Sequence, residues 1–269
     1  MKKTILQIDN MSFGFTPNNF LLNHINLELF SGEVAVIAGD NGCGKSTLLQ
    51  LILGKLTPCS GNIALYGKNP VKITRMPIVG VLSEPLHPVY GSIPTQLTGW
   101  EIFQWLSVLD NINEDVFLES LAKIGLSQDK LSRPVDTYSK GERQRFMTVV
   151  VTLRKPQLIL ADEPLEGLDS KSRQKLSLYL HQFAQQGGSV LWISHHLGEA
   201  LEYANRFFVI SDQGLHELSQ NRYSATITNE HGESNAHSFT SILQLNSVIE
   251  KNIEESSKLE IILSVNKDE

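Results

Sequence analysis

One segment constrains the fold of this chain more than any other: residues 39–47 read GDNGCGKST. The apolar run EVAVIA precedes this segment, and the helix-like stretch LLQLILGKL follows it. The segment fits the pattern G-x-x-x-x-G-K-[ST] at Gly39, Gly44, Lys45 and Ser46. In that pattern the backbone N–H groups turn inward around phosphate oxygens, and the start of the following helix favours negative charge. We therefore expect a phosphate-binding loop between a buried strand and a helix.

The residues of this loop have separate expected roles. Lys45 is expected to neutralise charge on the β- and γ-phosphates, and the Ser46 hydroxyl is expected to ligate Mg²⁺. Nucleotide contacts are expected along the whole loop, from Gly39, Asp40, Asn41, Gly42, Cys43, Gly44, Lys45, Ser46 and Thr47. Cys43 occupies a variable position of the pattern, and we interpret it as a small filler rather than a redox switch.

Two consecutive carboxylates end the apolar run QLILADE at residues 157–163. Because side chains alternate between faces along a strand, Asp162 and Glu163 are predicted to point to opposite faces and to have different roles. Asp162 suits the Mg²⁺ shell, through water, and Glu163 is left to orient or deprotonate an attacking water. The pair therefore predicts a metal and water site at the end of a buried strand.

Charge and composition argue against several classes of protein. The formal net charge of -6 and the pI of about 5.8 are unlike a general nucleic-acid-binding surface, which would be basic. No apolar run approaches the ~20 residues that span a bilayer, and the N-terminus MKKTILQIDNM lacks the apolar core of a secretory signal. Cys43 and Cys59 are too few for a disulfide framework or a zinc site, so we expect a reducing cytoplasm.

Hydrophobic periodicity predicts the elements around these motifs. Alternation over residues 4–10 and 25–29 predicts half-buried antiparallel strands. Strands buried on both faces of a mostly parallel sheet are predicted by four short apolar runs, at 33–39, 77–82, 157–162 and 189–194.

The middle and the end of the chain have different hydrophobic patterns. Helical spacing over 95–131, with a helix ending at Gly125, predicts a helical insertion into the sheet domain at about 84–154. After Gly214 the pattern weakens, although the stretches RYSATIT, FTSILQL and LEIILSV fit strands of a small appendage.

Residues 138–145, YSKGERQR, indicate which kind of protein this phosphate loop belongs to. A serine hydroxyl and helix-start N–H groups make a second anion site. The segment resembles the signature motif of the ATP-binding cassette (ABC) ATPases, with Ser139 and Gly141 at the two characteristic positions. The resemblance implies that these two residues grip the γ-phosphate of ATP held by another subunit. Lys140 replaces the commoner glycine, and Glu142 replaces the commonest glutamine.

Other motifs of the family follow in order. The stretch LEGLD at residues 165–169 resembles the D-loop, which crosses to the opposite subunit, with Leu165 and Glu166 in place of the usual threonine and serine. In the stretch WISHH, His195 stands where the family has a histidine that senses the γ-phosphate and holds the attacking water. His196 is interpreted as incidental.

Two further positions carry over from the family with differences. The stretch MSFGF makes Phe15 the aromatic that stacks on adenine, whereas Phe13 fits the core by strand alternation. The family glutamine that contacts Mg²⁺ and the membrane partner is absent from VGVLSEPLHP, where Glu84 matches best and Ser83 next.

The resemblance covers residues 4 to 217 and implies an α/β fold of the ABC type of P-loop NTPase. Such a fold has a mixed sheet core, an inserted helical subdomain and an N-terminal antiparallel β subdomain. We expect an ATPase domain over residues 1–217 and a C-terminal appendage of unknown role over residues 218–269.

The resemblance also implies an activity and partners. ATP with Mg²⁺ would close a head-to-tail dimer, either a homodimer or a heterodimer with a close paralogue, and hydrolysis would reopen it. The expected partner is a separate transmembrane permease, which would hold the chain at the cytoplasmic face of the membrane; no nucleic-acid partner is expected. The stretches LTGWEIFQWLSVL, TYSKGERQR and ISHHLGEALEYANRFFVI resemble ATPases of ABC-2-type exporters, which favours export.

Three alternatives remain open from the sequence. One is a non-transport ABC ATPase acting on a soluble assembly, such as iron–sulfur cluster biogenesis, where a Gly-Glu pair also occurs in the signature. Another is the translation-factor branch, which resembles two cassettes in one chain, whereas this chain has one. The third is a regulatory cassette that binds ATP without turnover, against which Lys45, Asp162, Glu163 and His195 all speak.

Overall fold

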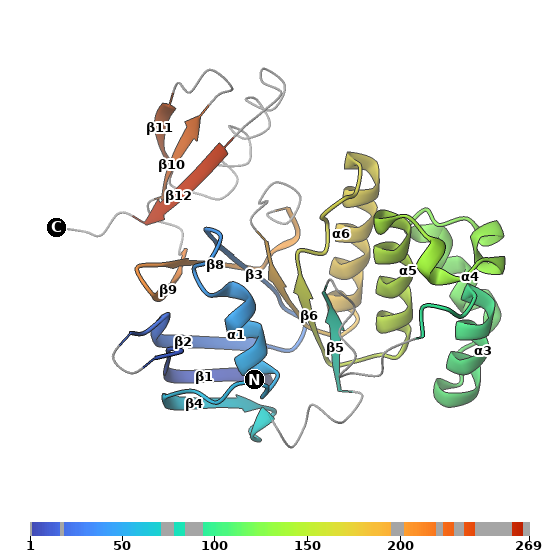
Figure 1. Cartoon of the computed structure of the whole chain (residues 1–269), viewed down its shortest axis with the longest axis horizontal. Helices are drawn as coiled ribbons and strands as arrows, with labels where there is room; N and C mark the ends of the chain where they lie inside the picture. The colour runs from blue at the N-terminus through green and yellow to red at the C-terminus, as the bar shows by residue number, and fades with distance from the viewer. Residues whose placement is uncertain are drawn as a thin grey trace.

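The computed structural model describes residues 2–16, 19–70, 78–83, 94–194 and 202–218, together with three strands near the C-terminus. Within these ranges, none of the helices combines the length and the apolar character that crossing a bilayer requires. Figure 1 shows a central sheet with helices packed around it and a group of helices at one end.

The central sheet has six strands in the order β5-β6-β7-β3-β8-β9. The first five strands in this order pair in parallel, and β9 pairs antiparallel to β8, so the sheet is mixed. The strands are β3 (Val34–Gly39), β5 (Val79–Leu82), β6 (Leu158–Asp162), β7 (Val190–Ile193), β8 (Arg206–Ser211) and β9 (Gly214–Glu217). The four predicted apolar runs are thereby confirmed as parallel strands.

Strand β3 shows why such a run has no polar face. Ala35 and Ile37 belong to one apolar cluster, which α1 (Lys45–Ile52) and an N-terminal sheet cover. Val34 and Val36 belong to a second cluster, which α6 (Ser170–Gln185) covers on the other side. Because both faces are packed, every position of the strand must be apolar.

The N-terminal sheet is antiparallel, as the alternating pattern predicts, in the order β2-β1-β4. Its strands are β1 (Thr4–Phe13), β2 (Leu22–Phe30) and β4 (Ser60–Leu65). The register between β1 and β2 shifts between Ile8 and Met11, so the strict alternation of β1 is lost in its second half.

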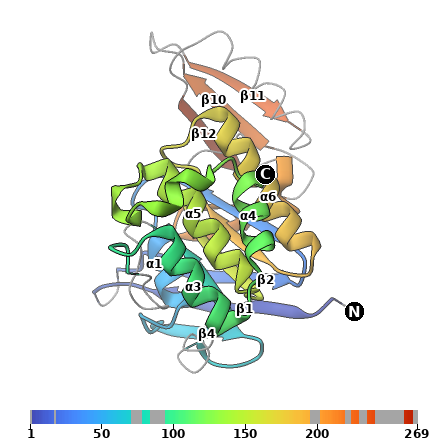
Figure 2. The same cartoon turned by 90° about the vertical axis from the view of Figure 1, so that its right-hand side faces the viewer.

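Over residues 94–154, the described part of the predicted helical insertion, the structure has three α-helices and two short 3-10 helices. They are α3 (Gly99–Asp110), α4 (Glu114–Lys123), Gln128–Ser132, Val135–Thr137 and α5 (Lys140–Leu153). The expected helix end at Gly125 is confirmed, since the amides of Gly125 and Leu126 bond back to Ala122 and Leu121. Figure 2 shows these helices gathered on one side of the molecule.

Helix α5 connects the insertion to the sheet. Phe146 and Val150 lie in the apolar cluster of the insertion, whereas Val151 packs against the cluster beneath the sheet. Because α5 packs against both clusters, its start is held at a fixed position relative to the end of β6, the next strand in the chain.

A separate three-stranded antiparallel sheet, in the order β11-β10-β12, ends the chain. Its strands are β10 (Tyr223–Thr228), β11 (Ser234–Phe239) and β12 (Glu260–Val265). The strands expected from RYSATIT and LEIILSV are confirmed. The strand between them lies just before FTSILQL, of which only Phe239 is among the described residues.

Candidate active site

The phosphate loop joins the end of β3 to the start of α1. Gly44, directly before the helix, has a φ of +106°. This left-handed conformation favours glycine, and a Cβ added there would also lie 2.9 Å from Leu22 Cδ2 of β2. No side chain caps α1 at Gly44. A helix start without a side-chain cap leaves backbone N–H groups available to a ligand, which makes it a suitable place for an anion.

Lys45 and Ser46 point from this helix start in two directions. The buried Lys45 Nζ donates to the carbonyl oxygens of Gly39 at 2.6 Å and Asp40 at 2.8 Å, so the ammonium lies inside the loop. The Ser46 hydroxyl lies 3.3 Å from Asp162 Oδ2, across the gap to the end of β6. The predicted metal-binding serine and aspartate are therefore neighbours.

The prediction that Asp162 and Glu163 point to opposite faces is wrong. Strand β6 ends at Asp162, and Glu163 adopts a left-handed backbone conformation with a φ of +48°. Because Glu163 is outside the strand, the alternation of side chains along β6 does not extend to it. Both carboxylates line one cavity. Glu163 is held by its own N–H, which donates to Ile193 O at 2.9 Å, and by the Ser194 hydroxyl, which donates to its Oε2 at 3.1 Å.

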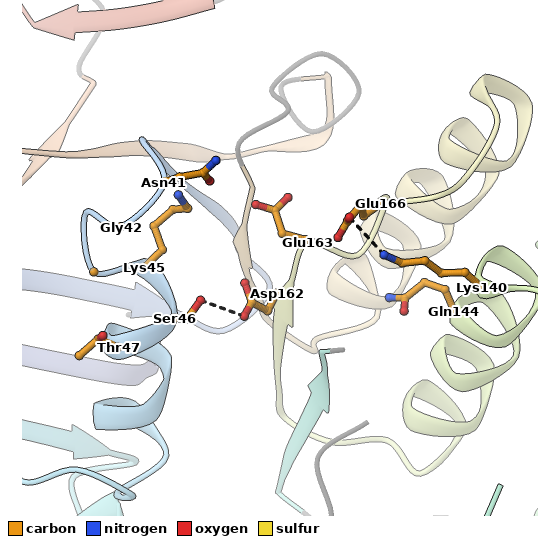
Figure 3. Close-up of a pocket in the computed structure, with 11 residues that line it drawn as sticks. Asn41, Gly42, Lys45, Ser46, Thr47, Lys140, Gln144, Asp162, Glu163 and Glu166 are labelled. Carbon is orange, nitrogen blue, oxygen red and sulfur yellow. Dashed lines mark hydrogen bonds and ion pairs between the residues drawn. The ribbon is translucent and has the colours of Figure 1, made fainter. Parts of the chain in front are cut away.

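The cavity that collects these residues measures about 560 Å³. Figure 3 shows the phosphate loop and α1 on one side, the first turns of α5 on the other side, and the end of β6 between them. Its lining residues are Asn41, Gly42, Gly44, Lys45, Ser46, Thr47, Asp162, Glu163, Glu166, Lys140 and Gln144.

The residues between α1 and β6 fit a hard divalent cation. Burial, and then the negative charge of Glu163, raise the pKa of Asp162 above its usual range. A carboxylate that is costly to ionise gains most from a nearby cation. The described residues hold no group of three or more His, Cys, Asp or Glu arranged as a metal cage. Among the described residues, Ser46 would ligate such an ion directly and Asp162 through water, with further water and phosphate oxygens completing the shell, as Mg²⁺ prefers.

The start of α5 is built from a reciprocal cap. The Ser139 hydroxyl accepts from the N–H of Glu142 at 3.2 Å, and the Glu142 carboxylate accepts from the N–H of Ser139 at 3.0 Å. This backbone donor is the main reason that the pKa of Glu142 is lowered. Ser139 and Gly141 do not line the cavity of their own phosphate loop.

Comparison with known proteins decides the family. The model of the ABC transporter family matches residues 22–166, more than half of the 269 residues. The chain belongs to the ABC transporter family. Its place there is that of the ATP-binding subunit, an ABC ATPase.

Relatives of this ABC ATPase differ in what they are named for. SrtF of Streptococcus pyogenes, a lantibiotic transport ATP-binding protein, is 29% identical and covers 75% of this chain and 84% of its own length. PotA of Marinobacter nauticus, a spermidine/putrescine import ATP-binding protein, is 28% identical over 82% of this chain and 59% of its own length. The chain spans 28% of the length of a longer relative from Dictyostelium discoideum, ABC transporter G family member 20.

Solved structures agree on the fold. The structure of cbiO1 from Clostridium perfringens, described as part of the ABC transporter complex cbiONQ, has a TM-score of 0.65 at 22% identity. The match covers 80% of this chain and 88% of that one. The mixed sheet, the helical subdomain and the N-terminal antiparallel sheet are thus those of an ABC-type P-loop NTPase, as expected.

The residue predicted to stack on adenine lies outside the phosphate cavity but next to its loop. Phe15 is 71% exposed and forms an edge contact with Phe13, which is buried as expected. Phe15 and Cys43 line a separate hollow of about 340 Å³. Burial raises the pKa of the Cys43 thiol, which keeps it protonated and agrees with its interpretation as a filler.

Two predicted site residues, His195 and Glu84, lie outside the described residues, whereas the alternative Ser83 is described and half-buried. The structure adds Gln144 and Ser194, which the motifs did not single out. Gln144 stands four residues after Lys140 on one helix, so helical spacing alone carried the signal that both face the cavity. Ser194 carried no comparable signal.

Proposed function

We propose that this ABC ATPase hydrolyses ATP with Mg²⁺ and so powers export through a separate membrane permease. One observation carries the hydrolytic part: Lys45 and Ser46 face Asp162 and Glu163 across a single cavity. A phosphate-binding cation, a metal site and a carboxylate base are thereby available at one place, which is what transfer of a phosphoryl group to water requires.

Each residue has a proposed step. Lys45 leaves the loop carbonyls and binds the β- and γ-phosphates, while loop N–H groups hold the phosphate oxygens. Ser46 would hold Mg²⁺ through its hydroxyl and Asp162 through water, and the ion, when bound, would neutralise charge on the phosphate oxygens. Glu163, oriented by Ser194, accepts a proton from the attacking water. By family resemblance, His195 holds that water, Glu84 adds to the Mg²⁺ site and Phe15 stacks on adenine.

A second subunit is part of this proposal. Ser139 and Gly141 are at the start of α5 but are not among the residues that line the cavity of their own phosphate loop. A head-to-tail dimer, of two identical chains or of close paralogues, would place this helix start against the γ-phosphate bound by the partner. Ser139→Arg is expected to block such closure and to leave ATP binding by the single subunit intact.

The permease, the direction and the location follow from the family. We propose a position at the cytoplasmic face of the membrane, held there by the permease. Export is favoured because residues 97–109, 137–145 and 193–210 resemble ABC-2-type exporter ATPases. We also propose the division into an ATPase domain over 1–217, with its helical insertion at about 84–154, and an appendage over 218–269. In support, β9 closes the central sheet at Glu217 and β10 starts another sheet.

Partner capture tests the transport function. The tagged chain would be isolated from detergent-solubilised membranes of its native host, and its partners would be identified and quantified. A polytopic membrane protein in near-equal amount is the expected result, and Lys45→Ala should retain it because docking does not need ATP. A soluble assembly protein as the main partner, with no membrane protein, would contradict the proposal and favour a non-transport ABC ATPase.

A further inference from the structure

Two residues that depart from the commoner family sequence contact each other. Lys140 Nζ, at the start of α5, lies 3.1 Å from Glu166 Oε1, in the loop between β6 and α6. Both residues line the cavity that contains Glu163, and Figure 3 shows the pair closing one side of it. The ion pair joins the helical insertion to the sheet core beside the reacting groups.

The backbones beneath this ion pair are in close contact. A Cβ added to Gly141 would lie 2.9 Å from Leu168 Cδ2 and 3.2 Å from Gly167 O. A Cβ added to Gly167, whose φ is +76°, would lie 3.0 Å from Lys140 Cδ. The stem of Lys140 therefore packs over Gly167, and the start of α5 sits directly against the loop that begins at Glu163.

That loop transmits position from Glu166 to Glu163. It is a pair of tight turns in which the Glu166 N–H donates to Glu163 O at 3.1 Å and the Leu168 N–H donates to Leu165 O at 3.2 Å. Glu163 itself has a left-handed backbone conformation, which the surroundings must maintain. A displacement of Glu166 therefore reaches the backbone of Glu163 within one hydrogen-bonded turn.

The ion pair is too exposed to matter much for global stability. The side chains of Lys140 and Glu166 are 39% and 51% exposed, and such pairs change an equilibrium constant by no more than about fivefold. A fivefold change in an equilibrium constant still matters where the equilibrium concerns the position of a catalytic group.

Another ion pair, Lys130–Glu142 at 3.0 Å, connects the same helix start to the rest of the insertion.

We propose that Lys140 and Glu166 form an ionic tether that fixes the signature helix start to the loop carrying Glu163. Both are positioning residues, because they hold the helix start that carries Ser139 at a fixed position relative to Glu163. The effect of the tether on turnover rests on the proposed hydrolysis.

A double-mutant cycle on the full chain tests the tether. Lys140→Met keeps the stem over Gly167 and removes the charge, and Glu166→Gln removes the opposing charge. Each single variant is expected to lower kcat about two- to fivefold with KM for ATP unchanged, because Lys45 still binds the phosphates. The double variant should lose no more than the worse single variant, and the exchanged pair Lys140→Glu with Glu166→Lys should recover kcat. Losses that multiply in the double variant, or an effect on KM alone, would overturn the proposal.

A control pair separates this effect from general loss of charge. Lys123 and Glu119 form a comparable exposed pair at 2.9 Å on α4, so Lys123→Met and Glu119→Gln should leave kcat unchanged. If they lower kcat equally, the tether is not specific.

A second readout separates the tether from the proposed hydrolysis. If the wild-type chain hydrolyses no ATP, the proposed function fails, and the tether is then read from amide hydrogen exchange over residues 163–169. Exchange about two- to fivefold faster in both single variants, and not faster again in the double, supports it. Unchanged exchange overturns it.

Discussion

The Ser194 hydroxyl donates a hydrogen bond to Glu163 Oε2 at 3.1 Å and so joins the ends of β7 and β6. Ser194 is almost completely buried, and its N–H donates at 3.1 Å to the carbonyl oxygen of Ile37 in β3. Glu163 is therefore oriented by the rigid edge of the sheet rather than by its own loop alone. This arrangement is what a general base requires if its oxygen is to meet the attacking water in one geometry.

Removal of the Ser194 hydroxyl should affect turnover more than binding. A hydrogen bond to a charged group contributes about 1.5–3 kcal/mol, so Ser194→Ala is expected to lower kcat about tenfold or more and to leave KM for ATP nearly unchanged. Steady-state phosphate release measures both. Ser189→Ala is the matched control, because Ser189 is also buried but flanks the other end of β7, where its hydroxyl donates to Phe30 O rather than to Glu163. It should cost stability and spare kcat; equal losses in both variants would contradict the positioning role.

Asp162→Asn should reveal the cost of the buried carboxylate through pH. Because the pKa of Asp162 is raised in the folded chain, folding favours its protonated form, and that contribution is lost as pH rises through the folded pKa. Without Mg²⁺, the variant should therefore unfold at a higher temperature than wild type at neutral pH. The difference should shrink toward about pH 4, near the unfolded pKa of aspartate. A variant that is less stable at neutral pH would contradict the raised pKa.

Gln144 provides a contrast between stability and activity. Its side chain is 6% exposed, and its Nε2 finds no hydrogen-bond partner within the part of the chain that the structure describes. A buried donor without a partner costs about 1–3 kcal/mol, so Gln144→Leu is expected to leave the melting temperature unchanged or to raise it. If the amide serves the ATP reaction in this cavity, the same variant should lower kcat. A drop in melting temperature would show instead that Gln144 supports the fold.

Phe15 and Phe13 should behave as opposites, although they are in contact. Stacking on a base contributes about 1–3 kcal/mol, so Phe15→Ala is expected to weaken ATP binding about fivefold or more with little change in melting temperature. Phe13→Ala should instead destabilise the chain by about 3–5 kcal/mol, because Phe13 is buried. Titration calorimetry and thermal unfolding measure the two effects. Unchanged ATP affinity in Phe15→Ala would remove Phe15 from the nucleotide site.

The sequence could predict those elements of the fold whose residues are determined by a single local requirement, such as burial or backbone conformation. The run from Val34 to Gly39 is apolar throughout because both faces are packed, and the phosphate loop can be recognised because the left-handed backbone at Gly44 favours glycine. These features depend on local chain chemistry, and the structure agrees with them.

The parts that sequence could not predict depend on where a regular element stops or on contacts between distant segments. Strand alternation misplaced Glu163 because β6 ends one residue earlier, at Asp162, and the backbone turns left-handed there. The contact of Lys140 with Glu166 joins residues of two elements whose packing no periodicity encodes. Both differences lie at the candidate site, where local rules commonly give way to function.

The most direct test of ATP hydrolysis at this cavity is phosphate release by the wild-type chain, Glu163→Gln and Lys45→Ala, each with ATP binding measured beside it. We expect Glu163→Gln to bind ATP as tightly as wild type and to lose about 10²- to 10⁴-fold in turnover, since only the base is removed. In the presence of ATP and Mg²⁺ it should also accumulate as a dimer. Lys45→Ala should lose ATP affinity itself. Wild-type turnover by Glu163→Gln would contradict the account.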